Sequence, residues 1–103
     1  MKITYREQEF EFDLDAIDVA QAKVIKVHCG LTLKGITDGI AELDPDAMRA
    51  AFWLMHVQSS IPCDIDRINF PLVEFASAII EAAELKTKEM AEQAENEDGP
   101  KDE

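Results

Sequence analysis

Basic residues are scarce in this sequence. Only 10 of its 103 residues are Lys or Arg, against 22 Asp or Glu, and the formal net charge is −12. Nucleic acids and anionic lipid surfaces are bound through cationic side chains. The chain has no basic patch with interleaved aromatic residues, so we expect it to bind neither nucleic acid nor a membrane surface. The negative charge instead favours solubility and recognition of a basic partner.

Long apolar runs and cysteines are also rare. No stretch of about 18 apolar residues is present, so we expect no membrane-spanning helix. The opening residues MKITYREQ have neither an apolar core nor a small-residue cleavage site, and we expect no secretory signal. The two cysteines, Cys29 and Cys63, are too few for a disulfide scaffold. We therefore expect reduced thiols in a cytosolic protein.

No catalytic or ligand-binding motif is visible in the chain. His28, Cys29, His56 and Cys63 match the ligand types of a zinc site, but no CxxC or HxxxH pair supplies a chelating turn. Nothing marks the third, orienting group that a Cys–His nucleophile needs. The glycines are scattered, and Asp64-Ile65-Asp66 lacks the remaining ligands of a calcium loop. We predict no enzyme activity, no cofactor or metal, and no small-molecule substrate.

The apolar content, in contrast, is sufficient for one folded domain. Apolar residues make up 47% of a chain whose length is typical of a single domain. Residues 1–12 alternate between apolar and polar and are interrupted by Arg6-Glu7-Gln8, which predicts a short β-hairpin with one buried face. Two strands alone are marginal in water, so the hairpin must pack on helices or join a neighbour's sheet. The predicted buried side chains are Ile3, Tyr5, Phe10 and Phe12.

Two helices are predicted directly after the hairpin. The first is capped by Asp15 and ends before Gly30. The second follows Thr32 and contains Gly35 and Gly39, which weaken it but also leave a bare strip where another helix could pack closely. The predicted buried stripes are Ile17, Ala20, Val24 and Val27 in the first helix, and Leu33, Ile36, Ile40 and Leu43 in the second.

Two further helices complete the predicted fold. Asp44-Pro45-Asp46 is the clearest helix start in the sequence, and the helix that follows, over residues 47–59, is apolar around most of its surface. Such a helix is either central to the fold or presented to a partner. After a loop, Pro71 begins the fourth helix. The sequence thus predicts a mainly α fold, a small bundle of about four helices preceded by a short N-terminal β-hairpin.

The apolar stripe of the fourth helix fades near residue 86. We therefore expect a helical domain with its hairpin over residues 1–85 and an acidic tail over residues 86–103. The tail is expected to be frayed or disordered because it cannot bury enough apolar surface to offset the entropy lost on ordering.

Several short segments follow one another in a characteristic order. They are residues 10–13 leading into an acid-capped helix, Gly30-Leu31-Thr32-Leu33, Leu43-Asp44-Pro45-Asp46-Ala47, Ala51-Phe52-Trp53-Leu54, and the acidic-apolar segment 66–70. This order resembles the tail assembly chaperones of long-tailed, siphovirus-like bacteriophages. The likeness covers roughly residues 8–85, and a polar acidic tail completes it.

The resemblance implies a protein of the host cell cytoplasm that is absent from the mature virion. Members of the family coat the long, apolar, helical tape-measure protein and help to recruit tail-tube subunits, and they commonly form homo-oligomers. They are often made in two lengths by a programmed frameshift. Gly99-Pro100-Lys101 is a candidate position for it, because the codons GGC-CCA-AAG would contain the slippery heptamer CCCAAAG.

Five large apolar residues are the predicted protein-binding surface, since aromatic and Met-rich faces adapt to partners. They are Phe52, Trp53, Met55, Phe75 and Ile79. The same side chains could form the core of a small bundle, and their spacing leaves core and contact open. Trp53 lies on a different side of its helix from Phe52.

Two other classes of function remain open at this point. One is a structural head–tail connector or minor tail protein, in which the hairpin would join an intersubunit sheet. The other is an acidic regulatory protein that mimics nucleic acid, which predicts carboxylates spread evenly along one face. Here many acids lie instead in helix caps and in the tail.

Overall fold

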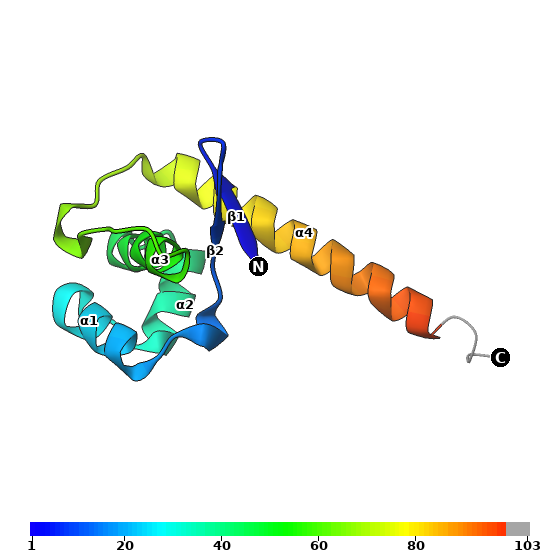
Figure 1. Ribbon diagram of the computed structural model, residues 1–103, viewed down its shortest axis with the longest axis horizontal. Helices are drawn as coiled ribbons and strands as arrows, with labels where there is room; N and C mark the ends of the chain where they lie inside the picture. The colour runs from blue at the N-terminus through cyan, green and yellow to red at the C-terminus, as the bar shows by residue number, and fades with distance from the viewer. Residues whose placement is uncertain (99–103) are drawn as a thin grey trace.

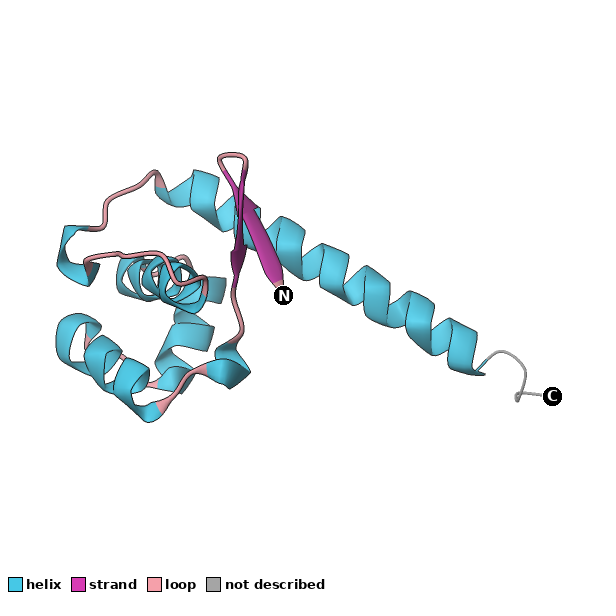
Figure 2. Ribbon diagram, viewed as in Figure 1, coloured by secondary structure: helices cyan, strands magenta, loops and turns pink. Residues whose placement is uncertain are grey.

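The computed structural model describes the backbone of residues 1–98 and the side chains of residues 1–87. Within this range four α-helices follow an N-terminal antiparallel hairpin, which confirms the predicted mainly α class (Figures 1 and 2). The elements are β1 (Lys2–Tyr5), β2 (Gln8–Glu11), α1 (Val19–Cys29), α2 (Leu33–Ala41), α3 (Pro45–Gln58) and α4 (Leu72–Asp98), with short 3-10 turns at Leu14–Ala16 and Ile65–Arg67.

The hairpin covers the bundle with the face that the alternation predicts. Ile3 pairs with Phe10 across the two strands, and both side chains are buried, as are Tyr5 and Phe12. The connecting turn consists of Arg6 and Glu7, whose φ angles are 52° and 68°. A two-residue turn with positive φ at both positions matches the natural twist of paired strands. The Arg6 guanidinium also donates two hydrogen bonds to the Glu74 carboxylate of α4, from Nε to Oε2 at 2.8 Å and from Nη2 to Oε1 at 3.1 Å.

The turn generates a first prediction. The left-handed backbone conformation of Glu7 is strained for a residue with a Cβ atom, whereas glycine adopts it freely. Glu7→Gly should therefore stabilise the protein by about 0.5–1 kcal/mol and raise Tm by a few degrees. Gln8→Gly is the control, because Gln8 lies in extended β2 and should lose stability on the same change. Thermal unfolding followed by circular dichroism measures both. A lower Tm for Glu7→Gly would contradict this account of the turn.

Helix α3 is the centre of the bundle. Its start is the predicted one: Pro45 occupies the first turn and the Asp44 carboxylate accepts a hydrogen bond from the backbone N–H of Ala47 at 3.0 Å. Helices α1, α2 and α4 and strand β2 all pack against α3. Its buried residues are Ala47, Met48, Ala50, Ala51, Trp53, Leu54 and Met55. Of the two readings of this apolar helix, central or presented, the structure shows a central one.

Helix α2 approaches α3 most closely at Gly39. A Cβ atom placed on Gly39 would overlap the Cβ of Ala47, whereas a Cβ on Gly35 would meet only Leu31 and Thr32 at ordinary contact distances. The absence of a side chain at Gly39 therefore allows α2 and α3 to pack closely, as the spacing of the two glycines suggested. Gly35 makes no such close contact.

This contrast predicts opposite effects for the same substitution at two sites. Gly39→Ala should destabilise the protein by about 1–3 kcal/mol, because overpacking against Ala47 outweighs the better helix propensity of alanine. Gly35→Ala should stabilise it by about 0.5–1 kcal/mol through propensity alone. Urea unfolding of both variants checks the difference. Equal effects would mean that Gly39 is not a packing position.

The faces of α1 and α2 differ from the predicted stripes. Helix α1 is capped by Asp18, not Asp15, and buries Ile25 and Cys29, while Val27 is 71% exposed. The predicted stripe is thus displaced by about one residue, or roughly 100° around the helix. In α2, Ile36 is buried but Leu33 is 50% exposed. Ile40 also packs against the core, whereas Leu43 is 41% exposed, so the predicted stripe of α2 is right at its centre and wrong at its two ends.

Helix α4 begins on the body and then leaves it (Figure 1). Among its side chains up to residue 87, which the structure describes, the last buried one is Ala82, close to the predicted domain boundary at residue 85. The backbone has no break there, however, and remains helical through Asp98. Glu, Lys, Gln and Ala dominate this stretch. These residue types favour a helix by their intrinsic propensity, which does not depend on tertiary contacts. Residues 99–103, including the candidate slip position at Gly99-Pro100-Lys101, lie outside the described residues.

Candidate protein-binding surface

The five predicted contact residues lie together, but mostly inside the protein. Met55 and Phe75 are fully buried, Trp53 and Ile79 are 8% and 7% exposed, and Phe52 is partly buried. All five belong to the core or pack directly against it. In this structure they hold the fold together, and of the five only Phe52 has a partly exposed side chain.

Phe52 belongs to an aromatic cluster that joins the hairpin to α3 and α4. Its ring stacks on Phe70 at 4.5 Å and meets Phe75 edge-on at 5.3 Å. His56 lies between Phe10 and Phe52, with ring centroids 4.7 and 4.6 Å away, and its Nδ1 hydrogen-bonds with the Phe52 carbonyl oxygen at 2.8 Å. The sequence pattern predicts neither Phe70 nor His56 as a member of this cluster. Such pairs add about 0.5–1.5 kcal/mol each beyond the area they bury.

The cysteines and histidines are arranged as structural groups. Burial raises the pKa of both the Cys29 and Cys63 thiols, which keeps them protonated at neutral pH. His28 Nδ1 lies 2.9 Å from Asp66 Oδ1 and links α1 to the loop before α4. Among the residues that the structure describes, no group of three or more His, Cys, Asp or Glu side chains could hold a metal ion.

An open apolar groove lies between α1 and α2. Both helices pack on α3 and make few contacts with each other, so a space of about 480 Å³ remains between them. Val19 is 84% exposed and Leu33 50% exposed at its edges, although a buried position would suit both. We define the α1–α2 groove by its lining residues, Ile17, Val19, Ala22, Lys23, Lys26, Leu31, Thr32, Leu33 and Ile36.

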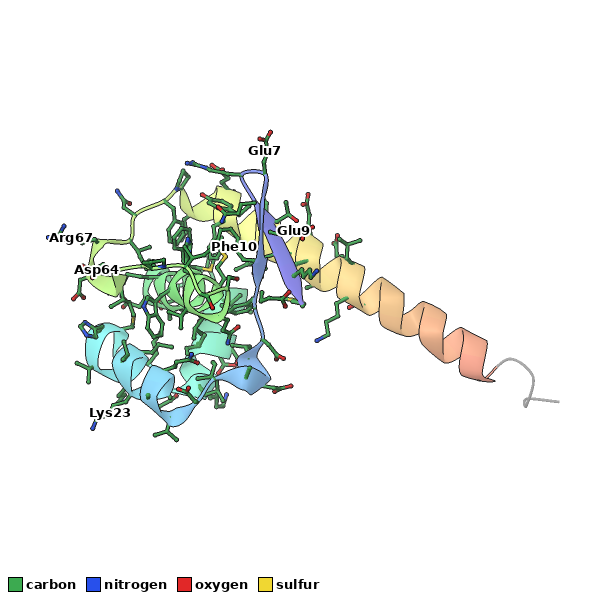
Figure 3. All side chains as sticks on the ribbon, in the orientation of Figure 1. Glu7, Glu9, Phe10, Lys23, Asp64 and Arg67 are labelled. Atoms are coloured by element: carbon green, nitrogen blue, oxygen red, sulfur yellow. The ribbon has the colours of Figure 1, made fainter. Side chains whose placement is uncertain are left out.

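Two lysines give the groove a charge opposite to that of the protein. Lys23 and Lys26 line it on the α1 side, and Figure 3 shows Lys23 extending from α1 into solvent. No acidic residue lines this groove, in a chain whose formal net charge is −12. The arrangement suits an apolar helix that carries acidic residues beside its apolar stripe.

Comparison with known proteins does not place the chain in a family. No family model, curated protein or solved structure matches it. Among the helices that the structure describes, none is long and apolar enough to cross a membrane.

The burial of Met55 gives a prediction that separates core from surface. Met55→Glu should cost about 4 kcal/mol or more, because it places a carboxylate at a fully buried position, and this approaches the whole stability of a small domain. Val27→Glu, at a 71% exposed position, should change stability by no more than about 0.5 kcal/mol. Far-UV circular dichroism in urea measures both. A fully folded Met55→Glu variant would restore Met55 as a contact residue.

Proposed function

We propose that this protein is a tail assembly chaperone of a long-tailed bacteriophage. It binds the tape-measure protein during tail morphogenesis and helps to recruit tail-tube subunits. The structural observation that supports this proposal is the exposed apolar α1–α2 groove on a small, strongly acidic domain. The segment order described above, which resembles that family, supplies the identity of the client.

The α1–α2 groove is the proposed client-binding site, in place of the buried residues named from the sequence. An amphipathic helix binds such a groove with apolar residues spaced three and four positions apart. Covering the exposed side chains of Val19 and Leu33 would contribute about 2–4 kcal/mol. Lys23 and Lys26 would pair with acidic residues that flank the client's apolar stripe.

One groove of this size binds a client only weakly, so we propose that the protein self-associates. The area offered by a few apolar side chains is far below that of a stable protein interface. A homo-oligomer presents many grooves to one long client, and the linked sites gain affinity by effective concentration. The acidic surface outside the groove keeps the coated client from aggregating. The site of action is the host cell cytoplasm, and the mature virion does not retain the protein.

A structural head–tail connector or minor tail protein is the second candidate. The observation that favours it is the hairpin, whose strand β1 has an open edge available to a neighbouring chain. The two functions differ in the composition of purified particles. A chaperone is absent from them, whereas a connector is present in fixed copy number.

Co-expression with the tape-measure protein encoded with this chain tests the groove. Wild-type protein should keep the tape-measure protein in the soluble fraction, and Val19→Glu combined with Leu33→Glu should reduce that fraction about tenfold, since the groove then repels an apolar helix. Val73→Glu is the matched control: Val73 is 70% exposed near the start of α4, outside the groove, and its change should have no effect.

Two results would contradict the proposal. One is a soluble tape-measure protein with the double variant, and the other is an equal loss with Val73→Glu. Circular dichroism of the purified variants establishes that they fold, so that a loss of solubilisation reports on the surface.

A further inference from the structure

Strand β1 directs hydrogen-bonding groups away from the hairpin. In an antiparallel pair, facing residues alternate between those that exchange hydrogen bonds and those that do not. Met1 and Phe12 exchange both bonds, at 2.9 and 3.1 Å, and the register places Ile3 and Phe10 in the next such pair. The N–H and C=O groups of Lys2 and Thr4 therefore point outward, away from β2.

The opposite edge of the hairpin is covered by the end of α3 at Glu11 and just beyond it. The backbone N–H of Glu11 donates to Ser59 Oγ at 2.7 Å, and that of Asp13 donates to Gln58 Oε1 at 2.7 Å. Gln58 Nε2 donates in return to the Asp13 carbonyl oxygen at 2.9 Å. Over the part of the chain that the structure describes, no group bonds the outward N–H and C=O of Lys2 and Thr4 in this way. The β1 edge is thus open at both Lys2 and Thr4, whereas the β2 edge is covered at Glu11 and open only at Glu9.

Helix α4 provides a floor beneath the open edge. It packs on β1 and continues on that side of the hairpin, away from α1–α3 (Figure 1). A hollow of about 490 Å³ lies beside the start of β1, and within it Leu85 is 60% exposed. The residues that line the hollow are Met1, Lys2, Glu11, Ala82, Leu85 and Lys86. An added strand would have a partner for its backbone and an apolar contact for its inner side chains.

The charges at this edge indicate the kind of strand that fits. The outward side chains of β2 include Glu9 and Glu11, whereas β1 carries Lys2, and Lys86 lines the hollow below it. Lys2 already faces Glu11 across the hairpin. A strand with acidic residues on its outer face would repeat this opposite-charge arrangement on the other side of Lys2, and such cross-strand pairs are stabilising.

We infer that β1 is a docking edge for an extended segment of a partner protein in which acidic and apolar residues alternate. The apolar residues face Leu85 and Ala82, and the acidic ones lie beside Lys2. A second copy of β1 does not have this pattern, because its residues are Lys-Ile-Thr-Tyr and include no acidic side chain. The edge shares no lining residue with the α1–α2 groove, so the inference does not depend on the proposed client.

A synthetic peptide with the sequence of residues 8–13, QEFEFD, is a suitable probe because it has this alternation. Titrated into the full-length, isotope-labelled protein, it should shift the amide resonances of Lys2 and Thr4 and protect them from hydrogen exchange. Binding should weaken at high salt. A peptide with lysines in place of its acidic residues, QKFKFK, should bind at least about tenfold more weakly.

Proline substitutions on the two edges are the matched test. Thr4→Pro removes an outward N–H that the hairpin does not use, and proline is tolerated on an edge strand. It should weaken peptide binding about tenfold or more. Glu9→Pro makes the same change on β2, where the N–H also points outward, and should leave binding unchanged. Lys2→Glu, which preserves the backbone, should weaken binding several-fold and serves if Thr4→Pro does not fold.

Three outcomes would overturn the inference. The first is that the amide resonances of Lys2 and Thr4 do not shift at about 1 mM peptide. The second is that Thr4→Pro and Glu9→Pro weaken peptide binding equally. The third is that the peptide shifts only resonances of the α1–α2 groove. The Val19→Glu variant should bind the peptide like the wild type, which keeps this result separate from that of the client experiment.

Discussion

The central position of α3, which buries seven of its 14 residues, is the constraint on which the rest of the structure depends. A helix that is apolar around most of its surface must be covered on several sides, and a chain of this size has few elements with which to do so. Helices α1, α2 and α4 and strand β2 each take one side. Their positions are set by the need to cover α3.

The aromatic cluster and the α1–α2 groove are both consequences of this arrangement. On one side of α3, the ring of Phe52 contacts the rings of Phe70, Phe75 and Tyr5. These contacts fill the interface between α3, α4 and the hairpin. On the other, α1 and α2 use their best packing faces on α3 and have no third helix to cover their remaining apolar flanks. The apolar side chains left over line the groove. A surface suited to a partner thus remains because packing on α3 leaves some apolar side chains of α1 and α2 uncovered.

The two candidate surfaces differ in the backbone that they would recognise. The α1–α2 groove offers side chains only, and its width between two helices suits a third helix. The β1 edge offers N–H and C=O groups and suits an extended strand. Both are rimmed by lysine, although acidic residues outnumber basic ones by more than two to one across the chain. Four of the ten basic residues, Lys2, Lys23, Lys26 and Lys86, lie at these two surfaces.

Local sequence determined the elements of this fold and most of their ends. The alternation of residues 1–12, Gly30 after α1, and Asp44-Pro45 before α3 act through neighbours in the chain, so each could be interpreted without knowing what lies nearby in space. Tertiary structure decided which apolar faces are covered. Met55 and Trp53 lie inside, while Val19 and Leu33 lie outside, although all four are apolar residues on helices. Their exposure depends on which elements reach α3, and the spacing of residues along one helix carries no information about how many others will pack against it.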